Sequence, residues 1–167
     1  MSDCLDALAA LEQGGVEAWR GLPFGCPPDS LAPAITDLDP SPGMADLGLQ
    51  KAFFRSGVWA GSGAPVQVWT TTDETEVLML AVADPPFLPT GTAAVERLGE
   101  PDARLDSARG SVPFPESEWV YAARGLAAFA NPDTDVVWRA TLFRPCTLEE
   151  YDDEFRVELL QRRFPMH

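Results

Sequence analysis

Histidine is nearly absent from this chain of 167 residues, since the only one is His167 at the C-terminal end. A terminal residue is usually frayed and solvated, so histidine-activated nucleophiles and histidine-ligated metal sites are not expected. Lysine is equally scarce, and Lys51, on an apparent strand edge, is a poor candidate for a Schiff base or a general base. The sequence therefore predicts no enzyme activity, no metal and no cofactor.

Basic residues are few in total, with 12 Lys and Arg against 26 Asp and Glu and a formal net charge of -14. Nucleic-acid binding needs a basic surface that neutralises phosphates, and an anionic membrane repels an acidic chain, so neither partner is expected. A basic protein partner is compatible with this charge, because complementary fields speed the encounter. The alternative is that the acidic residues serve only solubility.

The three cysteines, Cys4, Cys26 and Cys146, lie far apart in the sequence and include no CxxC pair. This usage predicts unpaired thiols in a reducing compartment. The N-terminus begins with acidic residues and shows no basic segment followed by a long apolar run, so no signal peptide is expected. No stretch is long and apolar enough for a membrane-spanning helix. We therefore expect a cytoplasmic protein.

The chain does contain an internal repeat, and with 46% apolar residues it has enough apolar side chains for a core. Residues 126–145 have the pattern of a strand, a polar turn and a second strand with alternating apolar positions. Residues 66–85 overlay them without a gap, so that Val77 meets Val137. The sequence therefore predicts two copies of one small unit, each of which ends in a hairpin.

Each copy also has a helical segment and an aromatic strand before its hairpin. The helical segments are predicted at residues 28–35 and 92–98, and the aromatic strands at residues 52–55 and 119–122. A three-stranded sheet with one helix buries its faces poorly, so the copies are expected to join. The predicted fold is α+β: two tandem helix-plus-antiparallel-strand repeats form one continuous sheet with helices on one face, plus a C-terminal helix. The expected units are an N-terminal helix (residues 1–21), two repeats (22–86 and 87–146) and the C-terminal helix (147–167).

Both ends of the chain are predicted to be helical. Ser2 or Asp3 caps the first helix, and Gly14 lies where it ends. At the other end Thr147 and Glu150 have the spacing of a capping box. Apolar residues at helical spacing follow, and they predict a helix that packs on the sheet or across the join between the copies.

Tryptophans are the first candidates for a binding surface, because five are many for this length and Trp carries much of the energy of protein interfaces. Glycines flank Trp59 on both sides, which places it on a loop and makes it the first choice for an exposed anchor. Trp138 shares its parity with Leu142 and is expected to point inward. For any single tryptophan, a place in the core is the alternative.

The acidic turn of the first hairpin is the second candidate. Asp73, Glu74 and Glu76 crowd this turn, although polar residues are common in turns for local reasons alone. Paired acids for hydrolysis would need a cleft that raises one pKa by burial, which a hairpin tip rarely supplies. The residues predicted to bind a partner are Trp59, Trp69, Asp73, Glu74, Glu76, Trp119 and Tyr121.

The second copy resembles a known family of small repeats. The motifs are the run from Leu98 to Pro101 (LGEP), where a helix ends, and the run from Trp119 to Tyr121 (WVY) in a strand. They resemble the family that includes the outer-membrane assembly lipoproteins and the beta-lactamase inhibitory proteins. The resemblance covers residues 88–145 and reaches the first copy only through the internal repeat. It implies antiparallel strands after a helical segment and a habit of binding proteins.

Two features depart from that family. Its members are exported, whereas this chain shows no export signal. The inhibitory proteins hold each unit with a disulfide, and Cys26 and Cys146 have no matching partners here. Beta-lactamase is therefore not implied as a target.

The leading hypothesis is a non-catalytic protein-binding module: an acidic inhibitor or immunity-type protein that masks a partner protein. It rests on the acidic charge, the tandem sheet, the tryptophans and the lack of catalytic residues. One alternative is an adaptor or chaperone in a secretion or assembly machine, with several transient partners. Another is a small-molecule-binding protein or an enzyme that uses carboxylates alone, which a deep pocket lined by two buried acids would favour.

Overall fold

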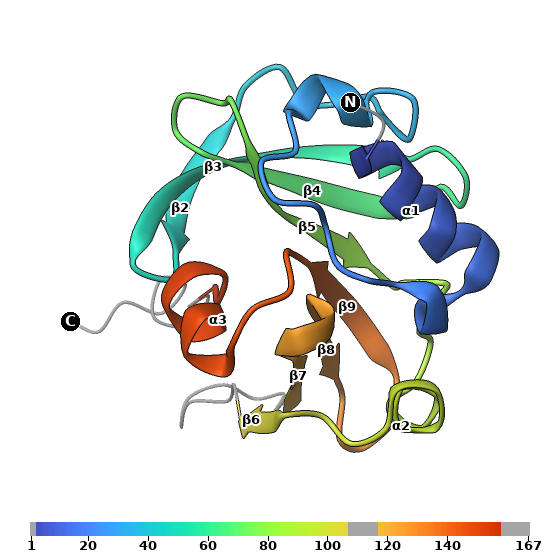
Figure 1. Ribbon diagram of the computed structural model, residues 1–167. Helices are drawn as coiled ribbons and strands as arrows, with labels where there is room; N and C mark the ends of the chain where they lie inside the picture. The colour runs from blue at the N-terminus through green and yellow to red at the C-terminus, as the bar shows by residue number, and fades with distance from the viewer. Residues whose placement is uncertain (1–2, 107–116, 158–167) are drawn as a thin grey trace.

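The computed structural model describes residues 3–106 and 117–157 of the chain (Figure 1). Within these ranges the α-helices are α1 (Asp3–Gly14), α2 (Gly91–Leu98) and α3 (Leu148–Glu154). Short 3-10 helices are η1 (Val16–Ala18), η2 (Pro28–Leu31) and η3 (Ala122–Arg124). The strands are β1 (Ile35–Thr36), β2 (Gly43–Leu47), β3 (Gln50–Trp59), β4 (Pro65–Thr70), β5 (Val77–Ala83), β6 (Ala103–Asp106), β7 (Ser117–Tyr121), β8 (Leu126–Ala130) and β9 (Val137–Leu142).

The nine strands of the described ranges form one sheet with the order β1-β3-β4-β5-β9-β8-β7-β6. β2 lies off this path and pairs with β3. All the pairings are antiparallel. The predicted α+β class with one continuous antiparallel sheet is confirmed.

The two predicted hairpins are confirmed by their pairing. In the β4–β5 hairpin the register shifts between Trp69 and Thr70. In the β8–β9 hairpin it shifts between Phe129 and Ala130. The gapless overlay from the sequence places these two irregularities on each other. Because a β-bulge bends and twists a strand locally, the two hairpins have this distortion at equivalent positions.

The two halves of the sheet meet where β5 pairs with β9. Near the middle of this ladder Ala81 pairs with Thr141, which is its own counterpart in the overlay. The pairs on either side of it are exchanged by the same overlay. The halves are therefore related by an approximate two-fold axis that passes through this ladder.

The aromatic strands correspond in a different register from the predicted one. The sequence aligned Ala52 with Trp119, but Arg55 pairs with Val68 in β4 and Trp119 pairs with Ala128 in β8. Since Val68 and Ala128 are counterparts, Arg55 corresponds to Trp119. The aromatic residues of β3 suggested the wrong alignment because β3 extends further and its first residues also pair with β2.

Helices lie on both faces of the sheet. α1 and α2 cover one face, where Leu8 and Ala94 are buried in one cluster with apolar residues of β4, β5, β8 and β9. α3 covers the other face, where Tyr151 joins a cluster with Met79 of the first half and Ala127 of the second. In Figure 1 the strands β7, β8 and β9 lie between α3 and α2. The C-terminal helix therefore packs across the join, which is one of the two positions that the sequence predicts. It is shorter than the predicted 147–167, since α3 ends at Glu154, and positions 158–167 lie outside the described residues.

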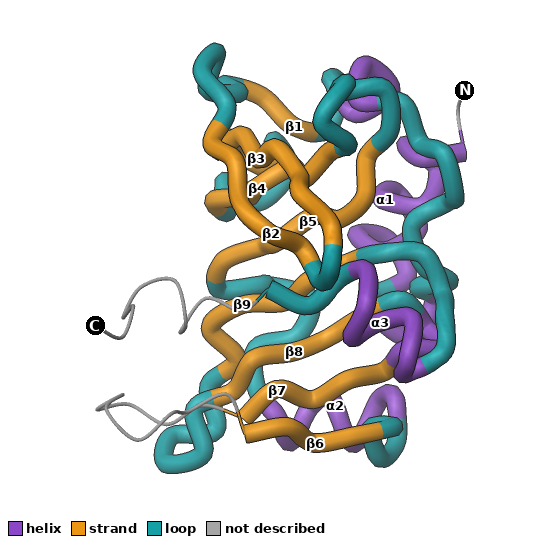
Figure 2. Tube along the Cα trace, turned by 90° about the vertical axis from the view of Figure 1, so that its left-hand side faces the viewer, coloured by secondary structure: helices purple, strands orange, loops and turns teal. Residues whose placement is uncertain are grey.

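The turn between β2 and β3 holds α3 on the sheet (Figure 2). Leu49 N donates a hydrogen bond to Asp153 O at 2.7 Å. Gly48 precedes it with φ +59°, and a side chain there would overlap the backbone of Asp153, so the turn requires glycine. α3 itself begins at the predicted capping box, in which Thr147 and Glu150 each accept a hydrogen bond from the other's backbone N–H.

The helices predicted from the sequence agree only in part with those of the structure. The first helix is confirmed as α1. Of residues 28–35 only Pro28–Leu31 are helical, as a 3-10 turn, and Pro33 has no N–H with which to continue it. α2 is capped by Thr90, whose hydroxyl accepts from Ala93 N at 3.0 Å. None of the described helices is long and apolar enough to cross a bilayer.

The prediction of unpaired thiols is wrong for Cys4 and Cys26, which form a disulfide with their Cα atoms 5.8 Å apart. The bridge links α1 to the loop before η2. No spacing motif announces it, because the pairing depends on how α1 folds back over the sheet. Cys146 is a free thiol, and burial raises its pKa to about 11.

Candidate functional site

Trp59 is buried, so its predicted exposure on a loop is wrong. It is the last residue of β3, pairs with Ile35 of β1, and is only 2% exposed. The glycines that suggested a loop belong to the turn after it, in which Gly63 N donates to Trp59 O at 2.7 Å. The Trp59 ring packs beside the Phe87 ring, with 6.0 Å between their centroids.

Two other tryptophans are Trp69, whose facing the sequence left open, and Trp138. Trp69 is buried beneath α3, with its ring 4.9 Å from the ring of Phe54. Trp138 was expected to point inward, but it is 36% exposed. The bulge explains the difference: β8 pairs with Val137 and with Arg139 but skips Trp138, so the parity of the strand changes there.

The predicted acidic turn uses its charges locally. Asp73 Oδ1 accepts hydrogen bonds from Thr71 Oγ1 at 2.6 Å and from Thr75 Oγ1 at 2.8 Å. These hydroxyl groups, Thr71 first, lower the pKa of the Asp73 carboxyl. Glu74 forms an ion pair with Arg55, whose Nη2 lies 3.0 Å from Oε2. The turn is thus arranged around its own hydrogen bonds and one neighbouring arginine.

Trp119 and Tyr121 lie on β7, in the second half. The guanidinium of Arg104 lies 4.3 Å from the centroid of the Trp119 ring. Tyr121 Oη donates to Gly99 O at 3.0 Å and so ties β7 to the end of α2. Burial raises the pKa of Tyr121 to about 12. Both residues therefore have structural roles within the second half.

The residues predicted from the sequence do not come together in one surface. Trp59 precedes the β3–β4 turn, whereas Asp73, Glu74 and Glu76 lie in the β4–β5 turn at the opposite end of β4. Glu76 lines a separate hollow of about 220 Å³ beside Phe24. Of the predicted residues, only Trp59 lines a second and larger cleft, which lies beside α1.

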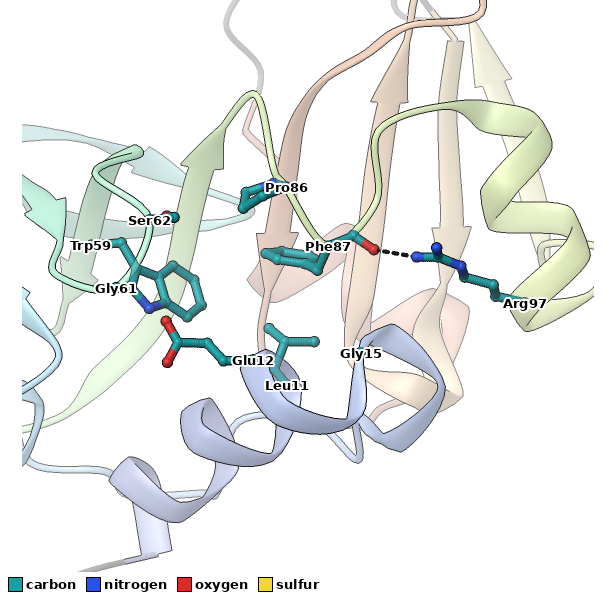
Figure 3. Close-up of a pocket in the computed structure, with 9 residues that line it drawn as sticks. All are labelled: Leu11, Glu12, Gly15, Trp59, Gly61, Ser62, Pro86, Phe87 and Arg97. Carbon is teal, nitrogen blue, oxygen red and sulfur yellow. Dashed lines mark hydrogen bonds between the residues drawn. The ribbon is translucent and has the colours of Figure 1, made fainter.

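A cleft of about 430 Å³ opens beside Trp59 (Figure 3). This volume lies in the range of roughly 300–1,000 Å³ that is typical of ligand sites. Segments far apart in the sequence form it: the end of α1, the β3–β4 turn, the loop between β5 and α2, and α2 itself. Its lining residues are Leu11, Glu12, Gly15, Trp59, Gly61, Ser62, Pro86, Phe87 and Arg97.

The cleft combines an apolar floor with a charged rim. Leu11, Trp59 and Phe87 supply the apolar surface. Trp59 Nε1 is buried and has no hydrogen-bond partner among the described residues. In Figure 3 the Glu12 carboxylate lies beside the edge of the indole ring that carries this nitrogen. A buried donor without an acceptor costs about 1–3 kcal/mol, so this N–H is a group that a ligand could satisfy.

Arg97 sits at the edge of the cleft with its charge already compensated. Its Nε lies 3.2 Å from Oε2 of Glu17, and its Nη1 donates to Phe87 O at 2.8 Å. The second bond is drawn in Figure 3. Arg97 therefore connects η1, α2 and the loop before α2. Because its positive charge is paired with Glu17, it contributes to the wall of the cleft more than to its net charge.

Sequence reasoning missed Glu12, Phe87 and Arg97 as site residues. No motif joins them, because they come from separate segments that only the fold brings together. The Gly61-Ser62-Gly63 run is not a phosphate loop, because no Lys-Ser or Lys-Thr follows it. Gly61 and Ser62 form one rim of the cleft.

The most buried acid of the described residues lies outside the cleft. Glu118 is 2% exposed, and its carboxylate accepts hydrogen bonds from Tyr151 Oη and from Arg156 Nε, the latter at 3.1 Å. Burial, and then the charge of Glu118, raise the pKa of Tyr151 well above its usual value. In residues 3–106 and 117–157 no group of three or more His, Cys, Asp or Glu side chains could hold a metal ion.

No protein-family model and no curated protein sequence matches this chain. Among solved structures, it is similar to the crystal structure of a DUF4309 family protein (YjgB) from Bacillus subtilis subsp. subtilis str. 168. The TM-score is 0.49 at 11% sequence identity, and the match covers 86% of this chain and 99% of that chain. A similarity of this size carries no argument about function.

Proposed function

We propose that this chain is a non-catalytic protein-binding module that masks a partner protein, as inhibitors and immunity-type proteins do. The observation that supports this most is the cleft beside Trp59, which joins aromatic walls to a charged rim. Buried aromatic residues inside a polar rim are typical of the centre of protein interfaces. The net charge of -14 suits a basic partner, because it speeds the encounter.

An adaptor or chaperone in an assembly machine is the second candidate, and it would use the same cleft for several transient partners. The resemblance of the second copy to the beta-lactamase inhibitory proteins and the assembly lipoproteins implies protein binding in both cases. Membership of that family stays a prediction. The two candidates differ in the number of partners: one for an inhibitor, several for an adaptor.

A small-molecule-binding protein is the third candidate, and the volume of the cleft supports it. An enzyme that uses carboxylates alone has less support. Such chemistry requires two acids in one cleft, one of them with its pKa raised by burial, and Glu12 is the one acid that lines the cleft beside Trp59. The hollow beside Phe24 is lined by Glu76 and Glu154, but neither is buried, and Glu154 pairs with Arg144. The buried Glu118 is bonded to Tyr151 and Arg156 in the core beneath α3.

Site-specific crosslinking tests the proposal. A photo-reactive amino acid replaces Ser62, an exposed residue on the rim, or in a control Thr134, an exposed residue in the β8–β9 turn. After irradiation in source cells, we expect one stoichiometric protein adduct from position 62 and none from position 134. Several substoichiometric adducts would favour the adaptor. A protein without any adduct, but with a low-mass ligand in native mass spectrometry, would favour the small-molecule candidate and overturn the proposal.

The disulfide bears on the compartment. The predicted cytoplasmic location rested on unpaired thiols and on the lack of a signal peptide, and the Cys4–Cys26 bridge removes the first of these grounds. Because disulfides persist mainly in oxidising compartments, we propose that the protein works in one. To test this, cells are lysed under denaturing conditions in the presence of an alkylating reagent, and the cysteines that react are counted. We expect one reactive thiol, that of Cys146. Three reactive thiols would restore the cytoplasmic location.

A further inference from the structure

The cleft carries one uncompensated negative charge. Arg97 is neutralised by Glu17 and bonded to Phe87 O, as its distances of 3.2 Å and 2.8 Å indicate. Glu12, on the last turn of α1, makes neither an ion pair nor a hydrogen bond among the described residues. The charge that a ligand would meet on entering is therefore that of the Glu12 carboxylate.

Gly61 leaves the room that this carboxylate occupies. An ideal Cβ built on Gly61 would lie 2.5 Å from Glu12 Oε1, closer than such atoms approach in proteins. The absence of a side chain at this position therefore allows the carboxylate to rest over the β3–β4 turn. Figure 3 shows the carboxylate beside the indole ring of Trp59.

The rest of the cleft selects the shape of the cation. Trp59 and Phe87 lie at 52° to each other and, with Leu11, form an apolar surface beneath the charged rim. Lysine and arginine side chains have this same division, with an apolar stem and a charged head that stays at the surface. Trp59 Nε1 adds a buried donor without a partner, which a peptide carbonyl could satisfy.

We propose that this cleft binds a lysine or arginine side chain on a peptide segment of the partner. The stem lies against Trp59 and Phe87, the charged head pairs with Glu12, and a neighbouring peptide carbonyl accepts a hydrogen bond from Trp59 Nε1. This inference rests on the proposed protein-binding function and adds the chemistry of the residue that is recognised. The acidic character of the whole chain supports a basic ligand through long-range attraction.

The test uses two small probes that differ only in the ammonium group. N-acetyl-lysine N-methylamide carries the ammonium head and two carbonyls, and N-acetyl-norleucine N-methylamide lacks the head. Binding is followed by the Trp59 indole N–H signal in heteronuclear NMR spectra, assigned with Trp59→Phe among the five tryptophans. We expect a saturable shift of this signal with the lysine probe. The norleucine probe should bind about fivefold more weakly, because a partly exposed ion pair contributes little free energy.

Matched variants locate the charge. Glu12→Gln keeps the shape and should weaken the lysine probe about fivefold, whereas Asp133→Asn removes the same charge from an exposed turn and should change nothing. Gly61→Ala keeps the charge but makes the Glu12 carboxylate shift, so it should weaken binding less than Glu12→Gln does. The four other indole signals report whether each variant is folded.

Equal binding of both probes, or unchanged binding after Glu12→Gln, would overturn the cation site. That failure is distinguishable from failure of the proposed function. A stoichiometric crosslinked partner without a lysine effect would keep the protein-binding role and reject the ligand chemistry. A lysine effect without any crosslinked partner would keep the cation site and reject the role.

Discussion

Ala81 and Thr141 lie directly opposite each other on β5 and β9, and each is the other's counterpart in the internal repeat. Because β5 pairs with its own counterpart β9, equivalent residues of the two copies face each other across the join. The residues have nevertheless diverged, because one is apolar and the other carries a hydroxyl. Thr141 is 1% exposed, and its Oγ1 has no hydrogen-bond partner among the described residues.

Thr141→Val should therefore preserve or increase stability, by up to about 1 kcal/mol. Valine has nearly the same shape, and the change removes a buried hydroxyl that is desolvated without compensation. Urea denaturation with a constant m-value measures the effect. Thr90→Val is the matched control: it removes the N-cap of α2 and should cost about 1 kcal/mol. A loss of similar size for Thr141→Val would show that its hydroxyl has a partner after all.

Asp135 links the second hairpin to α2. It has φ +64°, and its Oδ2 accepts from Thr92 N at 3.1 Å and from Thr92 Oγ1 at 2.7 Å. Asp135→Ala should cost about 1–2 kcal/mol, because it loses the acceptor at the helix start and places alanine in the left-handed region. Asp135→Asn should cost less, since asparagine keeps an acceptor and tolerates that conformation. The difference in urea midpoints measures this order. Asp133→Ala, at an exposed position of the same turn, should stay within about 0.5 kcal/mol of the parent.

Reduction of the Cys4–Cys26 bridge should lower the free energy of unfolding by about 3 kcal/mol. The bridge closes a loop of sequence separation 22, and its loss increases the freedom of the unfolded chain. Urea denaturation of the parent with and without reductant gives the value. Cys4→Ser combined with Cys26→Ser should show the same stability in both buffers. Cys146→Ser keeps the bridge and should respond to reductant as the parent does. A parent that is insensitive to reductant would contradict the bridge.

The raised pKa values of two tyrosines lead us to expect a loss of stability at alkaline pH. Burial raises the pKa of Tyr121 to about 12 and that of Tyr151 well above its usual value. A raised pKa in the folded state means that folding favours the neutral phenol. The contribution is full below the unfolded pKa of about 10 and is lost as the pH rises from there toward the folded value. Denaturation at about pH 9 and about pH 11 should therefore differ, and Tyr121→Phe should reduce the difference. An unchanged difference in this variant would assign the effect to other groups.

Local patterns in the sequence determined much of the fold. The alternation in residues 66–85 and 126–145 specified two hairpins, and Thr147 with Glu150 specified the start of α3, because strand period and helix capping involve neighbours along the chain. The bulges were beyond that reasoning. They change the parity inside a strand, so Trp138 became exposed.

The candidate site was decided by the tertiary structure. Trp59 appeared from its glycine neighbours to be an exposed anchor, but pairing with β1 buries it and leaves it as the wall of a cleft. Glu12 is the free charge of that cleft, since Arg97 pairs with Glu17, and Cys4 reaches Cys26 because α1 folds back over the sheet. Sequence patterns report contacts between neighbours in the chain, whereas burial, charge compensation and disulfide pairing depend on distant segments that packing brings together.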